Sequence, residues 1–157
     1  MCLTACGEPP TAADSFKADF SVSRDGIAYS GALTLTDSGL SVTMTAPYTV
    51  EGMRFDYTSD GLSISRGGLS AKANPDYISA NAIPSVLHNT LTYLSQAAYT
   101  GSGNGEDSFT LPTPYGEAVI TASNGAPISL TDPYSGLEIT FDNVTIIGQD
   151  TADDDGS

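Results

Sequence analysis

A strict alternation of apolar and polar residues, followed by a tight-turn dipeptide, most constrains what this chain can fold into. From Phe16 to Val22 every second residue is apolar, which is the period of a β-strand with one buried face. Asp25-Gly26 follows, and this dipeptide favours a two-residue type I′ hairpin turn. The turn predicts opposed pairs of Val22 with Tyr29, Phe20 with Gly31, Ala18 with Leu33, and Phe16 with Leu35. The apolar residues then share one face of the hairpin, so turn and pattern predict the same register.

The next connection adds a third strand to this hairpin. Thr36-Asp37-Ser38-Gly39 predicts a four-residue loop. The resulting pairs are Leu35 with Leu40, Leu33 with Val42, and Gly31 with Met44. A glycine between Phe20 and Met44 leaves room for two large side chains or lets the sheet bend.

Later turn dipeptides predict three more hairpins. The predicted pairs are Tyr57 with Ile64 around Asp60-Gly61, Ile64 with Ala71 around Gly67-Gly68, and Thr121 with Ile128 and Val119 with Leu130 around Asn124-Gly125. Strands are expected over residues 118–122, 128–130, 137–141 and 144–147. The chain is therefore expected to form a meander of hairpins.

One segment departs from the alternation. Apolar residues recur at spacings of three and four, at Ile83, Leu87, Leu91, Leu94 and Ala98, which predicts an amphipathic helix of about four turns. Pro84 suits its first turn. The helix is expected to end before Gly101-Ser102-Gly103-Asn104-Gly105, which predicts a loop without regular structure. Strands, one central helix and further strands indicate an α+β fold class.

Charge and length limit the protein further. The 157 residues suffice for one core, and no apolar run approaches the roughly 20 residues of a membrane-spanning helix. The chain has 19 acidic and 5 basic residues and a net charge of −14, which opposes binding to nucleic acid. All the basic residues precede position 73, so the second half is the more acidic.

Both cysteines lie within the first seven residues. Leu3-Thr4-Ala5-Cys6 resembles a lipobox, the end of a bacterial lipoprotein signal peptide. On this resemblance Cys6 is the lipidated N-terminus and makes the membrane a partner. The charged start and apolar stretch of a complete signal peptide are absent, so we expect a truncated start of the chain or its gene. We expect a lipobox remnant and flexible tether over 1–15, a single β-rich domain over 16–148, and a disordered acidic tail over 149–157.

Several segments, in order, resemble the periplasmic lipoprotein-carrier (LolA-like) superfamily. They are Phe16-Lys17-Ala18-Asp19-Phe20, Tyr29-Ser30-Gly31-Ala32-Leu33, Ala46-Pro47, Asp60-Gly61-Leu62, Ile83-Pro84-Ser85-Val86-Leu87, and a closing hairpin from Pro127 to Phe141. The resemblance implies a strongly curved antiparallel sheet, an incomplete barrel, with the helix packed on its concave side around an apolar cavity for acyl chains. The chain departs from the soluble carrier in having no Trp, few basic residues and its own lipid-anchor motif. These departures favour a membrane-tethered binder over a shuttle.

The sequence offers little catalytic chemistry. His88 is the single histidine, expected on the flank of the helix, and no cysteine follows Cys6, which excludes zinc sites and Cys–His nucleophiles from the body. No Gly-x-Ser-x-Gly turn is present, and Gly101–Gly105 lacks the Lys and Ser or Thr of a phosphate-binding loop. We therefore predict no enzyme, no cofactor and no metal.

Two functions remain open. The first is a lipid-anchored extracytoplasmic protein that holds an acyl chain, lipid or lipopeptide in a half-barrel cavity. Its expected lining residues are Phe20, Leu33, Val42, Met44, Phe55, Leu87, Leu91 and Leu94. The alternative is a cell-surface structural or protein-interaction domain with a filled core and no small-molecule ligand. In both, the protein is anchored to the bacterial cell membrane through Cys6.

Overall fold

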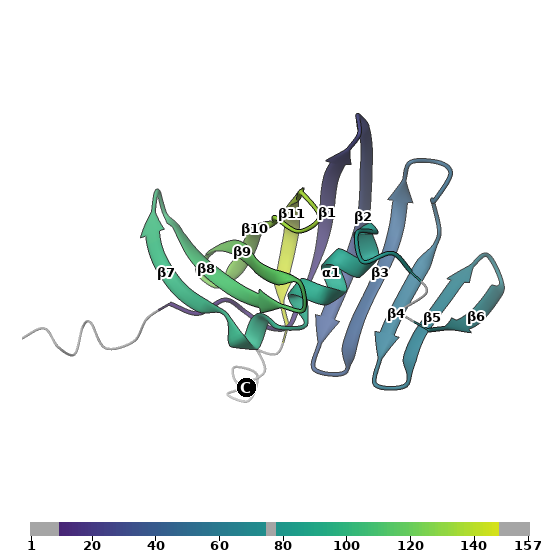
Figure 1. The fold of residues 1–157 in the computed structure, drawn as a ribbon, viewed down its shortest axis with the longest axis horizontal. Coiled ribbons are helices and arrows are strands. Elements are labelled where there is room, and N and C mark those ends of the chain that lie inside the picture. Colours follow the sequence, from purple (N-terminus) through teal and green to yellow (C-terminus); the bar gives the residue numbers. More distant parts are fainter. Residues whose placement is uncertain (1–9, 75–77, 148–157) are drawn as a thin grey trace, which may run out of the picture.

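One antiparallel sheet makes up most of the molecule. The computed structural model describes residues 10–74 and 78–147, whose 11 strands follow the order β6-β5-β4-β3-β2-β1-β11-β10-β9-β8-β7. The strands are β1 Phe16–Arg24, β2 Ile27–Thr36, β3 Gly39–Ala46, β4 Arg54–Thr58, β5 Gly61–Arg66, β6 Leu69–Ala73, β7 Ala98–Gly103, β8 Glu106–Thr113, β9 Gly116–Ser123, β10 Ala126–Asp132 and β11 Leu137–Ile146. The sheet curves without closing into a barrel, and β6 and β7 are its two edges (Figure 1). The predicted α+β class, with a hairpin-built sheet and one α-helix, is confirmed.

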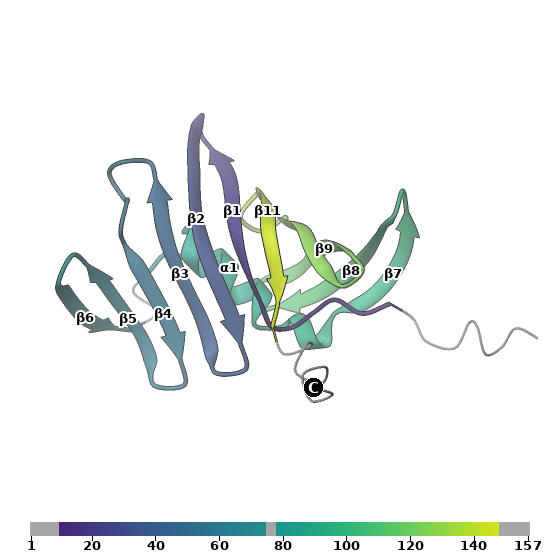
Figure 2. The ribbon, with the colours of Figure 1, turned by 180° about the vertical axis from the view of Figure 1, so that it is seen from behind.

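Two meanders join at the centre of this sheet. Strands β1 to β6 run outward to one edge, the chain returns through the helix α1 Ile83–Leu91, and β7 to β11 run inward from the other edge. The first and last strands then pair, with Phe20 opposite Phe141 and Val22 opposite Ile139. Figure 2 shows β1 and β11 side by side with α1 behind them. The two halves therefore share one continuous sheet.

The first hairpins form in the predicted register. Val22 lies opposite Tyr29 and Phe16 opposite Leu35, and Gly31 lies opposite Met44. Asp25 and Gly26 have φ of 53° and 80°, the left-handed conformation that a type I′ turn requires. The Gly67-Gly68 pairing of Ile64 with Ala71 is confirmed as well.

A second kind of turn, Thr-x-x-Gly, corrects two details of the prediction. In the Thr36–Gly39, Thr58–Gly61 and Thr113–Gly116 turns, the Thr hydroxyl accepts a hydrogen bond from the N–H two residues on, at 3.1 to 3.2 Å. The Thr and the Gly then pair, and only the two residues between them form the loop. The loop at 36–39 is thus shorter than predicted. The pairing of Tyr57 with Ile64 is wrong: Tyr57 lies opposite Leu62, because Thr58 centres the turn on Ser59-Asp60.

The Asn124-Gly125 turn forms as predicted, but its register does not continue. The pairing shifts by one residue between Pro127 and Ser129, so Thr121 lies opposite Ser129 and Val119 opposite Thr131. The predicted pairs with Ile128 and Leu130 are therefore wrong. The β-bulge brings Pro127 and Leu130, three residues apart, to the buried face of β10.

The α-helix is shorter than the apolar spacing predicts. It ends at Leu91, a single 3₁₀ turn η2 covers Leu94–Gln96, and Ala98 begins β7. Thr92, the C-cap residue, donates its hydroxyl hydrogen to the carbonyl of His88 at 2.6 Å. Thr side chains compete in this way with the regular helical ladder, which accounts for the early end.

Two further expectations are corrected in the second meander. Gly101 and Gly103 lie in β7, and Asn104-Gly105 forms a turn with positive φ at both residues, so this segment is a hairpin and not an irregular loop. Residues 137–146 form one strand instead of two. Asn143 has a φ of 53°, and the pairing of β11 with β1 shifts its register there without ending the strand. The strand β8 has no counterpart in the sequence prediction.

The helix covers the apolar face of the sheet. Val86, Leu87 and Leu91 are almost completely buried in one cluster with inward side chains of both meanders. The half-buried ring of His88 also stacks on Tyr57 of β4, with ring centroids 4.1 Å apart. Burial lowers the pKa of His88, so the imidazole is neutral near pH 7.

We predict that Gly31→Ala lowers the free energy of unfolding by about 1–3 kcal/mol. An added methyl group would meet the carbonyl oxygen of Thr43 and the Phe20 ring, the ring at 2.8 Å. Gly68→Ala is the matched control, because nothing lies within 4 Å of a side chain there. Urea unfolding followed by circular dichroism measures both. Equal stability of the two variants would contradict the close packing at Gly31.

We also predict that His88 makes stability depend on pH below about pH 7. The folded protein disfavours the protonated imidazole, whereas the unfolded chain takes up a proton below about pH 6.5. The free energy of unfolding should therefore be highest above this value and decrease as the pH falls. Since His88 is the single histidine, His88→Gln should flatten this part of the curve. If the free energy of unfolding of the two proteins depends on pH in the same way, His88 is not the responsible group.

Candidate functional site

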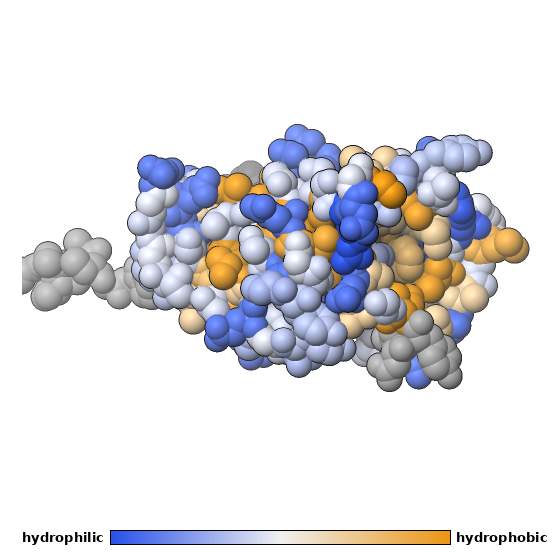
Figure 3. Space-filling model, turned by 45° about the horizontal axis from the view of Figure 1, so that its top comes forward, coloured by the Kyte–Doolittle hydropathy of each residue, from blue (hydrophilic) through white to orange (hydrophobic). Residues whose placement is uncertain are grey.

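An apolar pocket lies between the first meander and the start of the helix. Its volume is about 210 Å³. It is lined by Arg24, Tyr29, Met44, Val50, Met53, Phe55, Ala82, Ile83 and Pro84. Figure 3 shows hydrophobic residues gathered at the end of the molecule formed by β3 to β6 and the start of α1. We call this hollow the apolar pocket.

The loop between β3 and β4 forms one wall of the apolar pocket. Met53 accepts a hydrogen bond from Met44 N–H, and Gly52 N–H donates to the carbonyl of Met44, both at 2.8 Å. Within the loop, Val50 N–H donates to Pro47 and Met53 N–H donates to Val50, both at 3.0 Å. These bonds fix Val50 and Met53 beside the strand residues. The opposite wall is the first turn of α1, where Val86 N–H donates to Ala82.

A second hollow lies at the other end of the helix and is much more polar. It has a volume of about 920 Å³, and its walls include Asp14, Asp37, Tyr57, His88 and Leu91. The Tyr57 hydroxyl is buried and has no hydrogen-bond partner among the described residues. Burial raises the pKa of Tyr57. The nearby Ser85 hydroxyl offsets part of this rise, although the two hydroxyl groups do not form a hydrogen bond.

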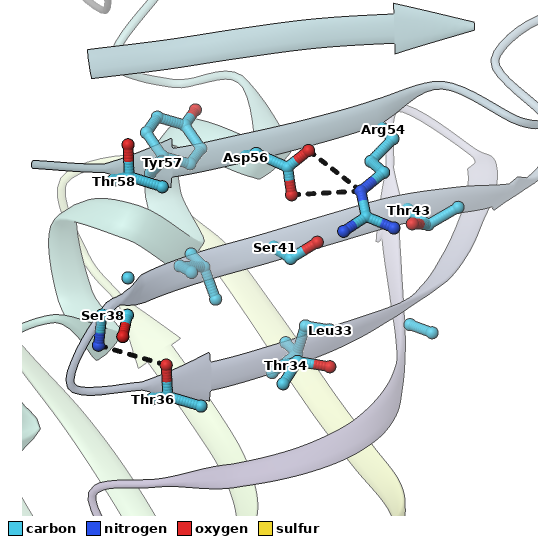
Figure 4. A pocket seen from close by; sticks show the side chains of 13 residues that line it. Leu33, Thr34, Thr36, Ser38, Ser41, Thr43, Arg54, Asp56, Tyr57 and Thr58 are labelled. Carbon is cyan, nitrogen blue, oxygen red and sulfur yellow. Dashed lines mark hydrogen bonds and ion pairs between the residues drawn. The ribbon is translucent and has the colours of Figure 1, made fainter. Parts of the chain in front are cut away.

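The outer face of the sheet carries a shallow polar pocket of about 350 Å³ (Figure 4). Thr34, Ser41 and Asp56 lie in register across β2, β3 and β4 on the face opposite the core. Arg54 donates to the Asp56 carboxylate at 2.9 and 3.0 Å. Burial opposes ionisation of Asp56, but the hydrogen bonds from Arg54 and Ser41 and the charge of Arg54 keep its pKa below the usual value. Both charges of this pocket are thus already paired.

The structure distributes the eight predicted lining residues over the whole core. All eight, Phe20, Leu33, Val42, Met44, Phe55, Leu87, Leu91 and Leu94, are buried in one cluster. Met44 and Phe55 line the apolar pocket, whereas Leu91 and Leu94 line the polar hollow. Val42 and Leu87 have no exposed surface. A ligand role of this set remains a prediction.

Sequence reasoning missed the loop residues of the apolar pocket. Val50 and Met53 belong to no strand, and strand periodicity therefore does not select them. Their signal is that two apolar residues occur in the short polar segment between Pro47 and Arg54. Tyr29 was predicted only as the residue opposite Val22, and the structure confirms that pairing.

In the described segments, no three His, Cys, Asp or Glu side chains come together as metal ligands. Neither helix within residues 10–74 and 78–147 has the length and apolarity that crossing a bilayer requires.

Comparison with known proteins bears on the fold. By sequence, no protein-family model and no curated protein matches the chain. Among solved structures, the chain is similar to a LolA superfamily protein from Nitrosomonas europaea, with a TM-score of 0.50 and 11% identity over 88% of this chain and 89% of that one. It is also similar to a DUF1329 family protein from Desulfovibrio piger ATCC 29098, with a TM-score of 0.44 and 10% identity over 87% of each chain. The resemblance that the sequence segments indicated is thus confirmed at the level of architecture: the chain has a LolA-like fold.

Proposed function

We propose that the protein binds an apolar ligand, such as an acyl chain, and performs no catalysis. The observation that carries this proposal is the apolar pocket, whose lining is apolar except for Arg24 and the Tyr29 hydroxyl. A hollow lined by apolar side chains favours an apolar occupant over water, because water there finds few hydrogen-bond partners. The LolA-like fold is consistent with such a role.

The size of the apolar pocket suits part of one acyl chain. A cavity of about 150 Å³ already holds benzene in another protein, and this pocket measures about 210 Å³. Each methylene that leaves water contributes about 0.8 kcal/mol, so a few methylenes supply measurable affinity. Met44 and Met53 line the pocket with flexible thioether side chains, which adapt to ligands of different shape.

A second candidate function, protein interaction at the cell surface, is favoured by the surface of the other meander. Strands β7 to β11 carry acidic side chains and no basic ones, and the acidic side chains outside the core are Glu106, Asp107, Glu117, Glu138 and Asp142. Tyr115 and Tyr134, about half exposed, stack with centroids 4.5 Å apart on neighbouring hairpin ends. Exposed aromatic rings are enriched in protein interfaces.

We further propose that the protein is extracytoplasmic and tethered to the bacterial membrane through Cys6. The support is the lipobox-like Leu3-Thr4-Ala5-Cys6, which lies outside the described residues, as does the acidic segment 149–157. The described chain begins near the end of the β9–β10 hairpin, where Ala13 N–H donates to Gly125 at 2.8 Å. The apolar pocket belongs to the opposite half of the sheet (Figure 1). A tether at Cys6 therefore leaves the pocket away from the anchored end.

The pocket proposal predicts that Val50→Phe weakens binding of decanol roughly tenfold or more, because the larger side chain fills the hollow. Val119→Phe is the matched control: Val119 is 40% exposed on β9, between the buried Ala118 and Ile120 and hence on the face away from the core. Native mass spectrometry of each protein with increasing decanol measures occupancy. If the unaltered protein takes up no decanol, the filled-core interaction protein is the better account.

The anchor proposal predicts that the chain partitions into membranes when it is expressed in bacteria with a charged start and an apolar stretch added before its own Leu3-Thr4-Ala5-Cys6. Cys6→Ser should release it, because serine lacks the thiol through which the lipid is attached. Cys2→Ser is the control and should leave partitioning unchanged. Membrane and soluble fractions compared by immunoblot give the readout. Unaltered partitioning of Cys6→Ser would remove the lipoprotein assignment.

A further inference from the structure

Arg24 occupies a position of β1 that the alternation reserves for the core. Phe16, Ala18, Phe20 and Val22 are buried in turn, and Arg24 is the next residue on the same face. It is half-buried and lines the apolar pocket. The guanidinium of Arg24 thus lies at a position where the alternation of β1 predicts an apolar side chain.

No other charged side chain lines the apolar pocket. The chain has 19 acidic residues and only 5 basic ones, yet the single charge at this pocket is positive. Among the described residues, the one ion pair is Arg54 with Asp56, so no carboxylate there neutralises Arg24. A partly buried cation without a counterion is unfavourable, and an anion supplied by a ligand removes that cost.

The polar groups at this pocket also suit an anionic head group. The guanidinium presents N–H donors in a planar fork that matches the paired oxygens of a carboxylate or phosphate. The only other side-chain hydrogen-bonding group in the lining is the Tyr29 hydroxyl, on the strand that pairs with β1. The remaining lining offers only apolar side chains to the rest of the ligand.

We propose that the ligand is an amphiphile whose anionic oxygen head, carboxylate or phosphate, binds Arg24 while its acyl chain fills the apolar pocket. This proposal rests on the apolar-ligand function and names the class of ligand. It also predicts a preference that opposes the net charge of −14, since a protein so negative repels anions elsewhere on its surface.

The test compares four ten-carbon probes by isothermal titration calorimetry with the full chain: decanoate, decyl phosphate, decanol and decyltrimethylammonium. Decanoate, decyl phosphate or both should bind roughly tenfold or more tightly than decanol, and the cationic probe more weakly than decanol. The two anionic probes distinguish a carboxylate from a phosphate head. Arg24→Gln should abolish the preference, so that the anionic probes bind no more tightly than decanol, and a circular dichroism spectrum equal to that of the unaltered protein shows that the variant is folded. Arg24→Lys, which keeps the charge without the fork, should retain part of it.

Arg66→Gln is the control, because it removes the same charge from an exposed position of β5. Equal binding of charged and neutral probes, or an equal effect of Arg66→Gln, would overturn the head-group proposal and leave the apolar-ligand function standing. Binding of none of the probes would overturn the proposed function itself.

Discussion

The pairing of β1 with β11 holds the two halves of the molecule together. Each meander by itself is a set of local hairpins with one apolar face. Pairing strands more than a hundred residues apart merges these faces into one, and α1 then covers a single continuous core. The pairing also buries Phe16 against Phe141, whose rings meet edge to face with centroids 6.0 Å apart. A long-range contact therefore joins the local hairpins into one sheet with one core.

Local chemistry explains why much of the sheet could be predicted. A type I′ turn leaves one register that keeps all apolar residues on one side, so the Asp25-Gly26 hairpin follows from the sequence alone. Prediction failed where a side chain altered the local geometry. The hydrogen bond of the Thr58 hydroxyl centres the β4–β5 turn one residue earlier than predicted. The bulge between Pro127 and Ser129 shifts the register of β9 with β10, and α1 ends early where the Thr92 hydroxyl bonds the carbonyl of His88. The β1–β11 pair has no local signal, since no turn joins these strands.

The candidate site was only partly predictable for a related reason. Periodicity identifies side chains that face inward, and Met44 and Phe55 were found in this way. It does not distinguish a filled core from a hollow, which depends on where the 47–53 loop and the start of α1 come to rest. Arg24 is the exception that the alternation could have revealed, because it breaks an otherwise apolar series at the inward position.

The unclosed sheet has a further consequence at its two edges. In the part of the chain that the structure describes, no strand pairs with the outer side of β6 or β7, so each presents backbone groups that can template an added strand. Closed barrels avoid such growth by topology. Here the resistance is local. The edge strand β6 is short and carries Lys72, and β7 contains Gly101 and Gly103, which weaken β7 as a template. The open architecture thus depends on weak edges to keep the protein from polymerising.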